Sequence, residues 1–290
     1  MTQKTKLTRA YFISKDNSFR LFNGDSFKIL PKLNESFDMV FTDPPYFLSN
    51  DGFTIKSGKI SSVNKGSWDR LENNDQLNVF NETWISSIRN LMKDSATIWI
   101  SGTSHNIFSI GNALKKLDFK ILNIITWEKI NPPPNFSTRT FVHSTEHIIW
   151  ARKHEKTAHY FDYDLMKQIN NSKQMKDFWR FSAAGGWENN NSRHPTQKPL
   201  SLLCRIILAS TKIGDSILDP FAGSSTTGIA ANLLGRNYVG IERAKEYLDL
   251  SKQRKIDIQT NEIFNDYLSK LSGVENLDLE QYFQNPLFEH

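Results

Sequence analysis

Residues 216–242, SILDPFAGSSTTGIAANLLGRNYVGIE, decide the fold that we predict for this chain. The apolar stretch at Ser216–Asp219 predicts a buried strand, which runs through a turn of small residues into a helix at about Thr226–Leu234. A second strand is predicted at Tyr238–Glu242. A strand, a helix and a strand in this order predict parallel pairing, and the small-residue turn lets a ligand approach the backbone beside a helix N-terminus.

The same alternation of strands and helices occurs on the N-terminal side of this unit. Five apolar runs predict strands at Arg20–Phe22, Phe37–Thr42, Ala96–Ser101, Phe119–Trp127 and His147–Arg152. Helices are expected between several of them, notably at residues 77–92 and 106–117, where apolar side chains recur at helical spacing. We therefore predict one α/β domain over residues 1–290, built on a doubly wound, mostly parallel sheet.

Two regions depart from this alternation and are predicted to be insertions on the scaffold. Residues 50–75 are polar and rich in Gly and Ser, which suits a mobile loop over the active site. Residues 129–193 include NPPPNFSTRT, whose three prolines exclude regular structure, and we expect a recognition region there. Residues 256–290 are treated as a C-terminal extension without an assigned function.

The composition limits the classes of protein to which the chain can belong. It has 290 residues, 38% of them hydrophobic, which is enough for a packed core. No apolar run could span a bilayer and no secretory signal is visible, so we expect a cytoplasmic protein without a membrane partner. The single cysteine, Cys204, excludes a disulfide framework and a cysteine-based zinc site. A net charge of +5 suits a polyanionic partner without requiring one.

The segment Asp43-Pro44-Pro45-Tyr46 directly follows the predicted strand Phe37–Thr42. Ligand sites in open α/β sheets lie at the carboxyl ends of strands. Two prolines remove two N–H donors and leave carbonyl groups that only accept hydrogen bonds. Together with a carboxylate and the flat ring of Tyr46, they suit the exocyclic amine and the ring face of a nucleobase. Taken alone, the four residues also fit a simple proline turn in which the Asp is a cap.

Two further segments could bind ligands. The turn DPFAGSSTTG (219–228) lacks both the G-x-G-x-x-G pattern and the Gly-Lys-Ser/Thr of a phosphate loop, so dinucleotides and nucleoside triphosphates are poor candidates. Glu242 ends the next strand, 23 residues after Asp219, where an acidic side chain holds a ribose diol; a surface acid is the alternative. The segment HPTQKP (194–199) by itself indicates only a proline-bounded helix start, with Thr196 near the cap.

One pattern in the sequence resembles a metal site. HSTEH (143–147) matches H-x-x-E-H, in which two histidines on one face of a helix bind zinc. Here the pattern runs into the strand-like segment IIWAR, where His143 and His147 would be two pleats apart. We therefore expect no metal.

The order of the three segments, DPPY (43–46), then HPTQKP, then DPFAGSSTTG, resembles the permuted β class of amino-group DNA methyltransferases, which use S-adenosylmethionine. The resemblance covers residues 19–255 and implies a Rossmann-like methyltransferase fold. The chain is most similar to the DpnA-type subgroup of DpnII-type restriction–modification systems, which acts on adenine in GATC. The stretches that carry this similarity are DPPYFLSN, ATIWISGTSHNIFSIGN, FKILNIITWEK, HSTEHIIWARK, YDLMKQ and HPTQKP.

This resemblance implies roles for individual residues. Asp43 and the Pro44 carbonyl would accept hydrogen bonds from the N6 amine of a flipped adenine, and Tyr46 would stack on that base. Pro45 would fix the backbone. Holding both amine hydrogens out of the ring plane would localise the nitrogen lone pair for attack on a methyl group. The implied cofactor-binding residues are Asp25 at the cofactor adenine, Glu242 at the ribose, Thr196 and Lys198 at the methionine end, and Asp219, Phe221, Ala222, Gly223, Ser224 and Ser225 as a surrounding wall.

The chain departs from the family at one position of this wall. The family usually has Gly-Ser-Gly where this chain has Gly223-Ser224-Ser225. If position 225 requires a positive φ, Ser carries strain there that Gly would not. We expect activity to be retained. If the Ser at position 225 has an effect, we expect it on the affinity for the cofactor.

The sequence thus predicts an adenine-specific, site-specific DNA methyltransferase acting within GATC, on double-stranded and also on single-stranded DNA. Two alternatives stay open: an N4-cytosine methyltransferase, which usually has Ser in place of the Asp of DPPY, and a catalytically weak DNA-binding subunit. Expected partners besides DNA are a second copy of the chain, and a cognate restriction endonuclease without required contact. Candidate DNA-binding residues, for which a solvated surface is the alternative, are Lys56, Lys59, Lys65, Arg139 and Arg193.

Overall fold

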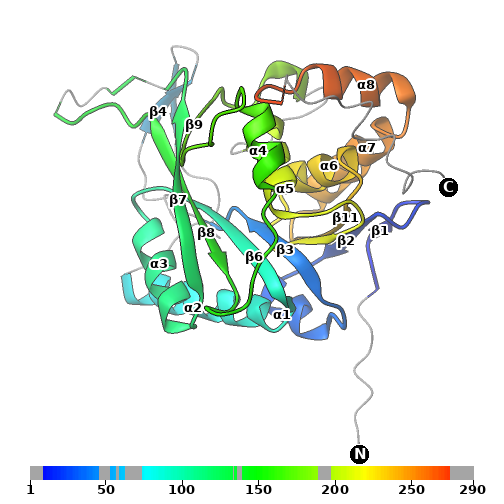
Figure 1. Ribbon diagram of the computed structural model, residues 1–290, viewed down its shortest axis with the longest axis horizontal. Helices are drawn as coiled ribbons and strands as arrows, with labels where there is room; N and C mark the ends of the chain where they lie inside the picture. The colour runs from blue at the N-terminus through cyan, green and yellow to red at the C-terminus, as the bar shows by residue number, and fades with distance from the viewer. Residues whose placement is uncertain are drawn as a thin grey trace, which may run out of the picture.

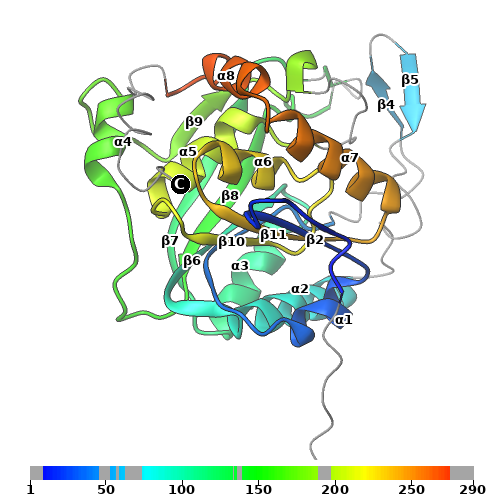
Figure 2. The same cartoon turned by 90° about the vertical axis from the view of Figure 1, so that its right-hand side faces the viewer.

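A nine-stranded sheet runs through the computed structural model, which describes residues 9–45, 53–56, 59–62, 74–132, 134–135, 139–188 and 197–274 (Figure 1). The strand order across the sheet is β1-β2-β11-β10-β3-β6-β8-β7-β9. The strands are β1 (Phe12–Ile13), β2 (Phe19–Asn23), β3 (Phe37–Thr42), β6 (Met92–Gly102), β7 (Lys120–Lys129), β8 (Thr145–Arg152), β9 (Phe178–Phe181), β10 (Ser216–Asp219) and β11 (Asn237–Glu242). A hairpin of β4 (Phe53–Lys56) and β5 (Lys59–Ser62) stands apart from this sheet (Figure 2).

Most of the sheet is parallel. The neighbouring strands β2, β11, β10, β3 and β6 all run in the same direction. β8 lies between β6 and β7 and is antiparallel to both, whereas β9 is parallel to β7 at the edge. The predicted α/β class and the mostly parallel sheet are therefore confirmed, and β8 is a reversed strand inside the sheet.

Helices cover both faces of the sheet, with α1 to α3 on one face and α4 to α8 on the other (Figures 1 and 2). They are α1 (Ser26–Ile29), α2 (Asn74–Arg89), α3 (Ile107–Lys116), α4 (Tyr163–Ile169), α5 (Leu200–Ser210), α6 (Thr226–Leu233), α7 (Lys245–Asp257) and α8 (Asn261–Ser269). Strand β3 shows the consequence: Met39 and Phe41 join the core on one face, and Val40 joins the other. A strand buried on both faces needs consecutive apolar residues, which explains the run Met39-Val40-Phe41.

The strands β10 and β3 are neighbours, but the helices that follow them lie on opposite faces. α6, after β10, packs with α5 and α7, whereas α2, the next helix after β3, packs with α1 and α3. Open α/β sheets bind their ligands at the carboxyl ends of the strands where the connections diverge in this way. The two segments that meet there are those predicted to carry chemistry, which follow β3 and β10.

The region predicted as an insertion, residues 129–193, contributes to the scaffold as well. It contains β8, which pairs with β6 and β7, and β9, which extends the sheet. The C-terminal region also packs on the core, because α8 buries Tyr267 and Leu268. The sequence pattern does not reveal α4, β9 or α8, because each is short and lies among polar residues. No helix in the described part of the chain has the length and apolar character needed to cross a membrane.

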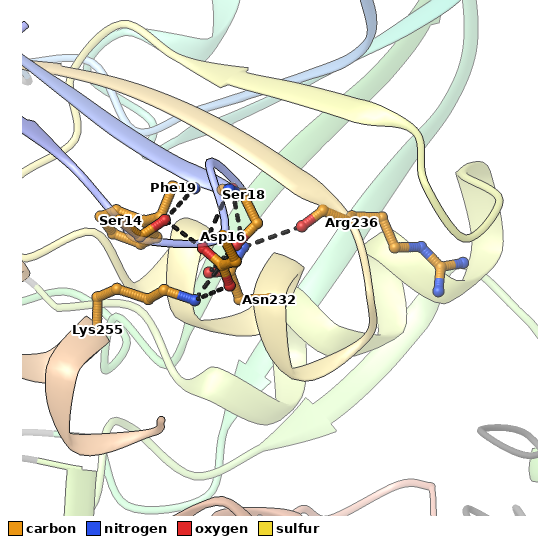
Figure 3. A network of polar contacts seen from close by, with 7 residues as sticks. All are labelled: Ser14, Asp16, Ser18, Phe19, Asn232, Arg236 and Lys255. Carbon is orange, nitrogen blue, oxygen red and sulfur yellow. Dashed lines mark hydrogen bonds and ion pairs between the residues drawn. The ribbon is translucent and has the colours of Figure 1, made fainter. Parts of the chain in front are cut away.

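A polar network fastens the turn between β1 and β2 to the helices α6 and α7 (Figure 3). Lys255 Nζ lies 3.1 Å from an Asp16 carboxylate oxygen and donates to Ser18 Oγ at 3.2 Å. Asn232 Nδ2 donates to the carbonyl oxygens of Ser18 and Arg236 at 3.1 and 2.9 Å. The Lys255 side chain is 5% exposed, whereas that of Asp16 is 52% exposed. Solvent around the Asp16 carboxylate therefore weakens the ion pair.

The Asp16 carboxylate should stabilise the fold in a pH-dependent manner. Burial acts to raise its pKa, but hydrogen bonds from Ser14 and Lys255 outweigh this and lower the pKa to about 2. A carboxyl group with a lowered pKa stabilises the folded state above its unfolded pKa, and the contribution is lost as the pH falls toward 2. We expect Asp16→Asn to lower the free energy of unfolding by about 1 kcal/mol at pH 7, after allowance for exposure.

Urea unfolding of the wild type and of Asp16→Asn between pH 7 and about pH 2.5 tests this expectation. The difference between the two proteins should shrink as the pH is lowered. A difference that stays constant across this range would show that the carboxylate charge is not its cause.

Candidate active site

Four acidic side chains lie where parallel strands end. Asp25 follows β2, Asp43 follows β3, Asp219 ends β10 and Glu242 ends β11. Because these four strands are parallel neighbours, their carboxyl ends share one edge of the sheet. All four residues were selected from the sequence, and the fold brings them to this common edge.

Lys198 forms ion pairs with two carboxylates, those of Asp43 and Glu146. Its side chain is only 6% exposed, and its Nζ lies 2.5 Å from Asp43 Oδ2 and 3.5 Å from Glu146 Oε2. Lys198 stands just before α5, so the start of that helix positions the ammonium group beside the end of β3. A buried ammonium destabilises a protein unless carboxylates face it, and here two of them do. The sequence indicated Lys198 only as a cofactor contact, and the structure adds its ion pair with Asp43.

Glu146 reaches this edge because β8 runs against its neighbours. The beginning of an antiparallel strand lies beside the ends of the parallel ones, and Glu146 is the second residue of β8. Its Oε1 lies 2.6 Å from Nζ of Lys129, the last residue of β7. Burial acts to raise the pKa of Glu146, but Lys198 and Lys129 outweigh it and the pKa is lowered. In the sequence, Glu146 stands out only as part of the zinc-like pattern, because its contacts depend on the reversal of β8.

Gln197 connects three parts of the site. Its Oε1 accepts a hydrogen bond from Ser224 Oγ at 3.1 Å, and its Nε2 donates to the Glu188 carbonyl at 3.4 Å. The Glu188 carboxylate in turn accepts from the backbone N–H groups of Leu200 at 2.8 Å and Gly185 at 3.1 Å. Glu188 therefore caps the start of α5, next to Lys198. Neither Gln197 nor Glu188 was predicted to belong to the site.

The small-residue turn after β10 is held by two carboxylates. Asp219 accepts from Phe221 N at 3.1 Å and from Thr227 Oγ1 at 2.7 Å. Glu242 Oε2 accepts from Gly223 N at 2.9 Å, and its Oε1 accepts from the N–H groups of residues 243 and 244. Burial raises the pKa of Glu242 against these backbone hydrogen bonds. The two carboxylates thus shape the turn that the sequence assigned to ligand binding.

Arg254 supports the same turn from α7. Its guanidinium is buried and donates to the Ser224 carbonyl at 2.7 Å and to Thr226 Oγ1 at 2.9 Å. Arg254 was not selected from the sequence. A basic residue in the polar run KQRK carries no signal of burial, because its partners lie in a different strand–helix unit.

Ser225 is in the left-handed conformation, with φ 54° and ψ 37°. The preceding Gly223 also has a positive φ, of 51°. The condition stated for strain at position 225 is therefore met, because a residue with a Cβ is disfavoured in this region. Ser225 is fully buried, so the turn holds it there by packing.

The remaining predicted cofactor and catalytic residues lie along this edge as far as they are described. Asp25 caps α1 by accepting from Phe27 N at 3.0 Å. Phe221 packs edge-on against Trp84, with ring centres 5.7 Å apart, and Ala222 is buried. Pro44 is buried and Pro45 is partly buried. Tyr46 and Thr196 lie outside the described residues.

The predicted DNA-binding residues that the structure describes belong to two separate elements. Arg139 is exposed in the connection between β7 and β8, two residues before Phe141, which is 95% exposed. Lys56 and Lys59 belong to the separate β4–β5 hairpin. Lys65 and Arg193 lie outside the described residues.

The zinc-like pattern runs into a strand, as predicted, and only its last three residues belong to that strand. Thr145–Arg152 forms β8, and the Glu146 carboxylate faces Lys129 and Lys198. Across the residues that the structure describes, no group of three or more His, Cys, Asp or Glu side chains could hold a metal ion.

Known proteins match most of the chain in sequence. A family model described as DNA methylase (N6_N4_Mtase) matches residues 37–253. The type II methyltransferase M2.MboI of Moraxella bovis is 56% identical over 264 residues, which cover 91% of this chain and 96% of the relative. The type II methyltransferase M2.DpnII of Streptococcus pneumoniae is 52% identical over 250 residues, which cover 86% and 92%.

Solved structures match the fold. The crystal structure of the M1.HpyAVI–SAM complex has a TM-score of 0.62 and 28% identity, covering 82% of this chain and 98% of that one. The cytosine-N4-specific PvuII DNA methyltransferase has a TM-score of 0.66, covering 87% of this chain and 93% of that one. At 19% identity, this second likeness concerns the fold alone.

Replacing Ser225 should relieve backbone strain. We expect Ser225→Gly to raise the free energy of unfolding by about 0.5–1 kcal/mol, because the left-handed conformation costs roughly 1–2 kcal/mol and the freer unfolded chain offsets part of it. Urea unfolding measures the change. Ser225→Ala is the control, since it removes the hydroxyl but keeps the Cβ, and an equal gain in that variant would contradict the strain explanation.

The Asp219 carboxyl should destabilise the unliganded fold at alkaline pH. Burial raises its pKa to about 7, with a further contribution from the charges of Asp43 and Glu242. A carboxyl group with a raised pKa favours the folded state at low pH, and that advantage is lost as the pH rises through 7. We expect Asp219→Asn to raise the free energy of unfolding by about 1–3 kcal/mol at pH 8, and by less at pH 5. Chemical unfolding at both pH values tests this, and a variant less stable than the wild type at pH 8 would refute it.

Proposed function

The chain belongs to the DNA methylase family, whose model matches residues 37–253, and from this premise we propose that it transfers a methyl group from S-adenosylmethionine to N6 of adenine in DNA. The relatives M2.MboI and M2.DpnII are type II methyltransferases, the class that works in restriction–modification systems. We propose GATC as the target on the resemblance to the DpnII-type subgroup. A second copy of the chain and a cognate endonuclease stay predictions.

The observation that carries this proposal is the position of Asp43. It follows β3 at the point where the connections of the sheet diverge, and the turn after the neighbouring strand β10 lies beside it. Asp43 is therefore placed where a base amine bound at β3 would meet a ligand bound at β10. Methyl transfer needs this juxtaposition, because its rate depends on how well the amine and the methyl donor are oriented.

The residues at this edge fit the methyl donor. Bound S-adenosylmethionine would supply an electrophilic methyl group on a positively charged sulfur. Burial raises the pKa of both Asp219 and Glu242, and a cationic ligand would favour their ionised forms. Gly223 lets a ligand approach the backbone closely. Asp25, Glu242 and the turn from Asp219 to Ser225 would hold the cofactor.

The chain's own contribution to the reaction would be orientation of the amine. The Asp43 carboxylate and the Pro44 carbonyl would accept the two amine hydrogens and turn the nitrogen lone pair toward the methyl group. Lys198 contacts Oδ2 of Asp43. A carboxylate offers about four acceptor positions, so this ion pair is compatible with a hydrogen bond from the substrate.

N4-cytosine methylation is the second candidate. It is favoured by the family model that matches this chain, because its name, N6_N4_Mtase, covers both reactions. Adenine is preferred because the chain has Asp43 where the N4-cytosine enzymes of the family usually have Ser. The two candidates differ in the methylated nucleoside that they produce.

We place contacts with single- or double-stranded DNA on the connection between β7 and β8. The exposed Phe141 ring and the neighbouring Arg139 combine a stacking surface with a positive charge. Aromatic and basic side chains together are what single-stranded nucleic acid binding uses. The lysines of the β4–β5 hairpin are further candidates for phosphate contact.

The proposed activity predicts labelled N6-methyladenine in a defined oligonucleotide. Transfer of labelled methyl from S-adenosylmethionine is measured on oligonucleotides with GATC, GTTC or GACC, each single- and double-stranded, followed by nucleoside analysis. We expect label only in adenine of GATC. Label in cytosine would support the second candidate, label in all three sequences would refute the GATC target, and no label in any DNA would refute the proposed function.

Asp43→Asn tests the acceptor role of the carboxylate in the same assay. Asn keeps the shape but replaces one acceptor oxygen with a donor that repels an amine hydrogen. We expect kcat to fall by about 100-fold or more, with the affinity for S-adenosylmethionine changed far less. A variant with near wild-type kcat would refute the role of Asp43.

A further inference from the structure

We infer that Glu146 is a positioning residue for methyl transfer, because it holds the Lys198 ammonium where that group can orient the Asp43 carboxylate. The inference rests on the proposed function and deepens it. It assigns a role to a residue that lies outside the three sequence segments and far from them in the chain.

The geometry places four charges in a row. Lys129 Nζ lies 2.6 Å from Glu146 Oε1, and Glu146 Oε2 lies 3.5 Å from Lys198 Nζ. Lys198 Nζ lies 2.5 Å from Asp43 Oδ2. The signs alternate along the row, so each inner group has an opposite charge on both sides. Glu146 thus touches Asp43 only through Lys198.

Burial makes this row rigid. The side chains of Lys198, Glu146 and Asp43 are 6%, 11% and 18% exposed. A lysine side chain is flexible, and one carboxylate alone would let its ammonium pivot. The Glu146 carboxylate, 3.5 Å away, restricts that freedom, and in a buried site the attraction is little screened. Glu146 therefore contributes to fixing where the Lys198 ammonium meets Asp43.

The row also begins at the base of the connection on which we place DNA. Lys129 N donates to the Ser144 carbonyl at 2.8 Å, which closes that connection at its foot. Glu146 is two residues further along, at the start of β8. The residue that holds Lys198 is thus attached to the segment that would contact the target.

A purely structural ion pair is the competing explanation, and the two make different predictions. Loss of a structural pair lowers stability and leaves the turnover of the folded enzyme unchanged. Loss of a positioning residue lowers kcat in folded enzyme, leaves the Kd for cofactor unchanged, and has no further effect once Lys198 is gone.

The test is a double-mutant cycle with Glu146→Gln and Lys198→Met in the full-length chain. For Glu146→Gln we expect kcat for methyl transfer to fall by about 10- to 100-fold, because small displacements of a reacting group cost about that much. The Kd for S-adenosylmethionine and the KM for DNA should stay within about twofold. In the Lys198→Met background, Glu146→Gln should lower kcat no further.

Two measurements keep the test decisive. Glu128→Gln is the matched control, since it removes one carboxylate from the same hairpin, where Glu128 pairs with Arg180 at 3.1 Å; it should keep wild-type kcat. Urea midpoints are measured for the four proteins of the cycle, which are the wild type, the two single variants and the double variant. They report whether Glu146 and Lys198 interact, without any need for activity. Should Glu146→Gln fail to fold, Glu146→Asp, which keeps the charge at shorter reach, takes its place with the same expected loss of kcat.

The inference is overturned by wild-type kcat in a folded Glu146 variant, by losses that multiply in the double variant, or by additive urea midpoints. Failure of the proposed function looks different, because the wild type itself would then label no DNA. In that event the urea cycle still shows whether Glu146 holds Lys198.

Discussion

The buried ammonium of Lys198 is the interaction on which the arrangement of this site depends. A positive charge that is almost removed from water must be matched by carboxylates, and the two that match it come from separate strands. Asp43 is at the end of β3 and Glu146 at the start of β8, while Lys198 precedes α5. The next residue back, Gln197, contacts the turn after β10 through Ser224. One short segment thereby brings together the end of β3, the turn after β10 and the start of β8.

The topology of the sheet explains why these groups can meet at all. Parallel strands deliver their carboxyl ends to one edge, so every residue that directly follows such a strand is a candidate for the site. A strand in the opposite direction delivers its first residues to that edge. β8 runs in this opposite direction between β6 and β7, and it adds Glu146, which the sequence placed only in a zinc-like pattern.

The same edge is where the fold accepts unfavourable features. Burial raises the pKa of Asp219 and of Glu242, and Ser225 is held in a left-handed conformation that favours glycine. Such features persist only where surrounding contacts compensate, and here Arg254 and Thr227 hydrogen-bond to the turn from α7 and α6. A cationic ligand bound near two carboxylates would compensate further, which makes cofactor binding and stability of the turn interdependent.

The sequence by itself determined the class of fold, the parallel strands and the acids that follow them, because hydrophobic periodicity and residues placed at strand ends are local properties. Asp43, Asp219 and Glu242 could be selected for this reason. The sequence could also raise the possibility of a positive φ at Ser225, because the family usually has Gly there. Only the tertiary structure decided which charges face one another. The roles of Glu146 and Arg254 depend on the reversal of one strand and on packing between separate units, and neither leaves a local signal, because an ion pair between distant segments is defined by where the chain returns in space.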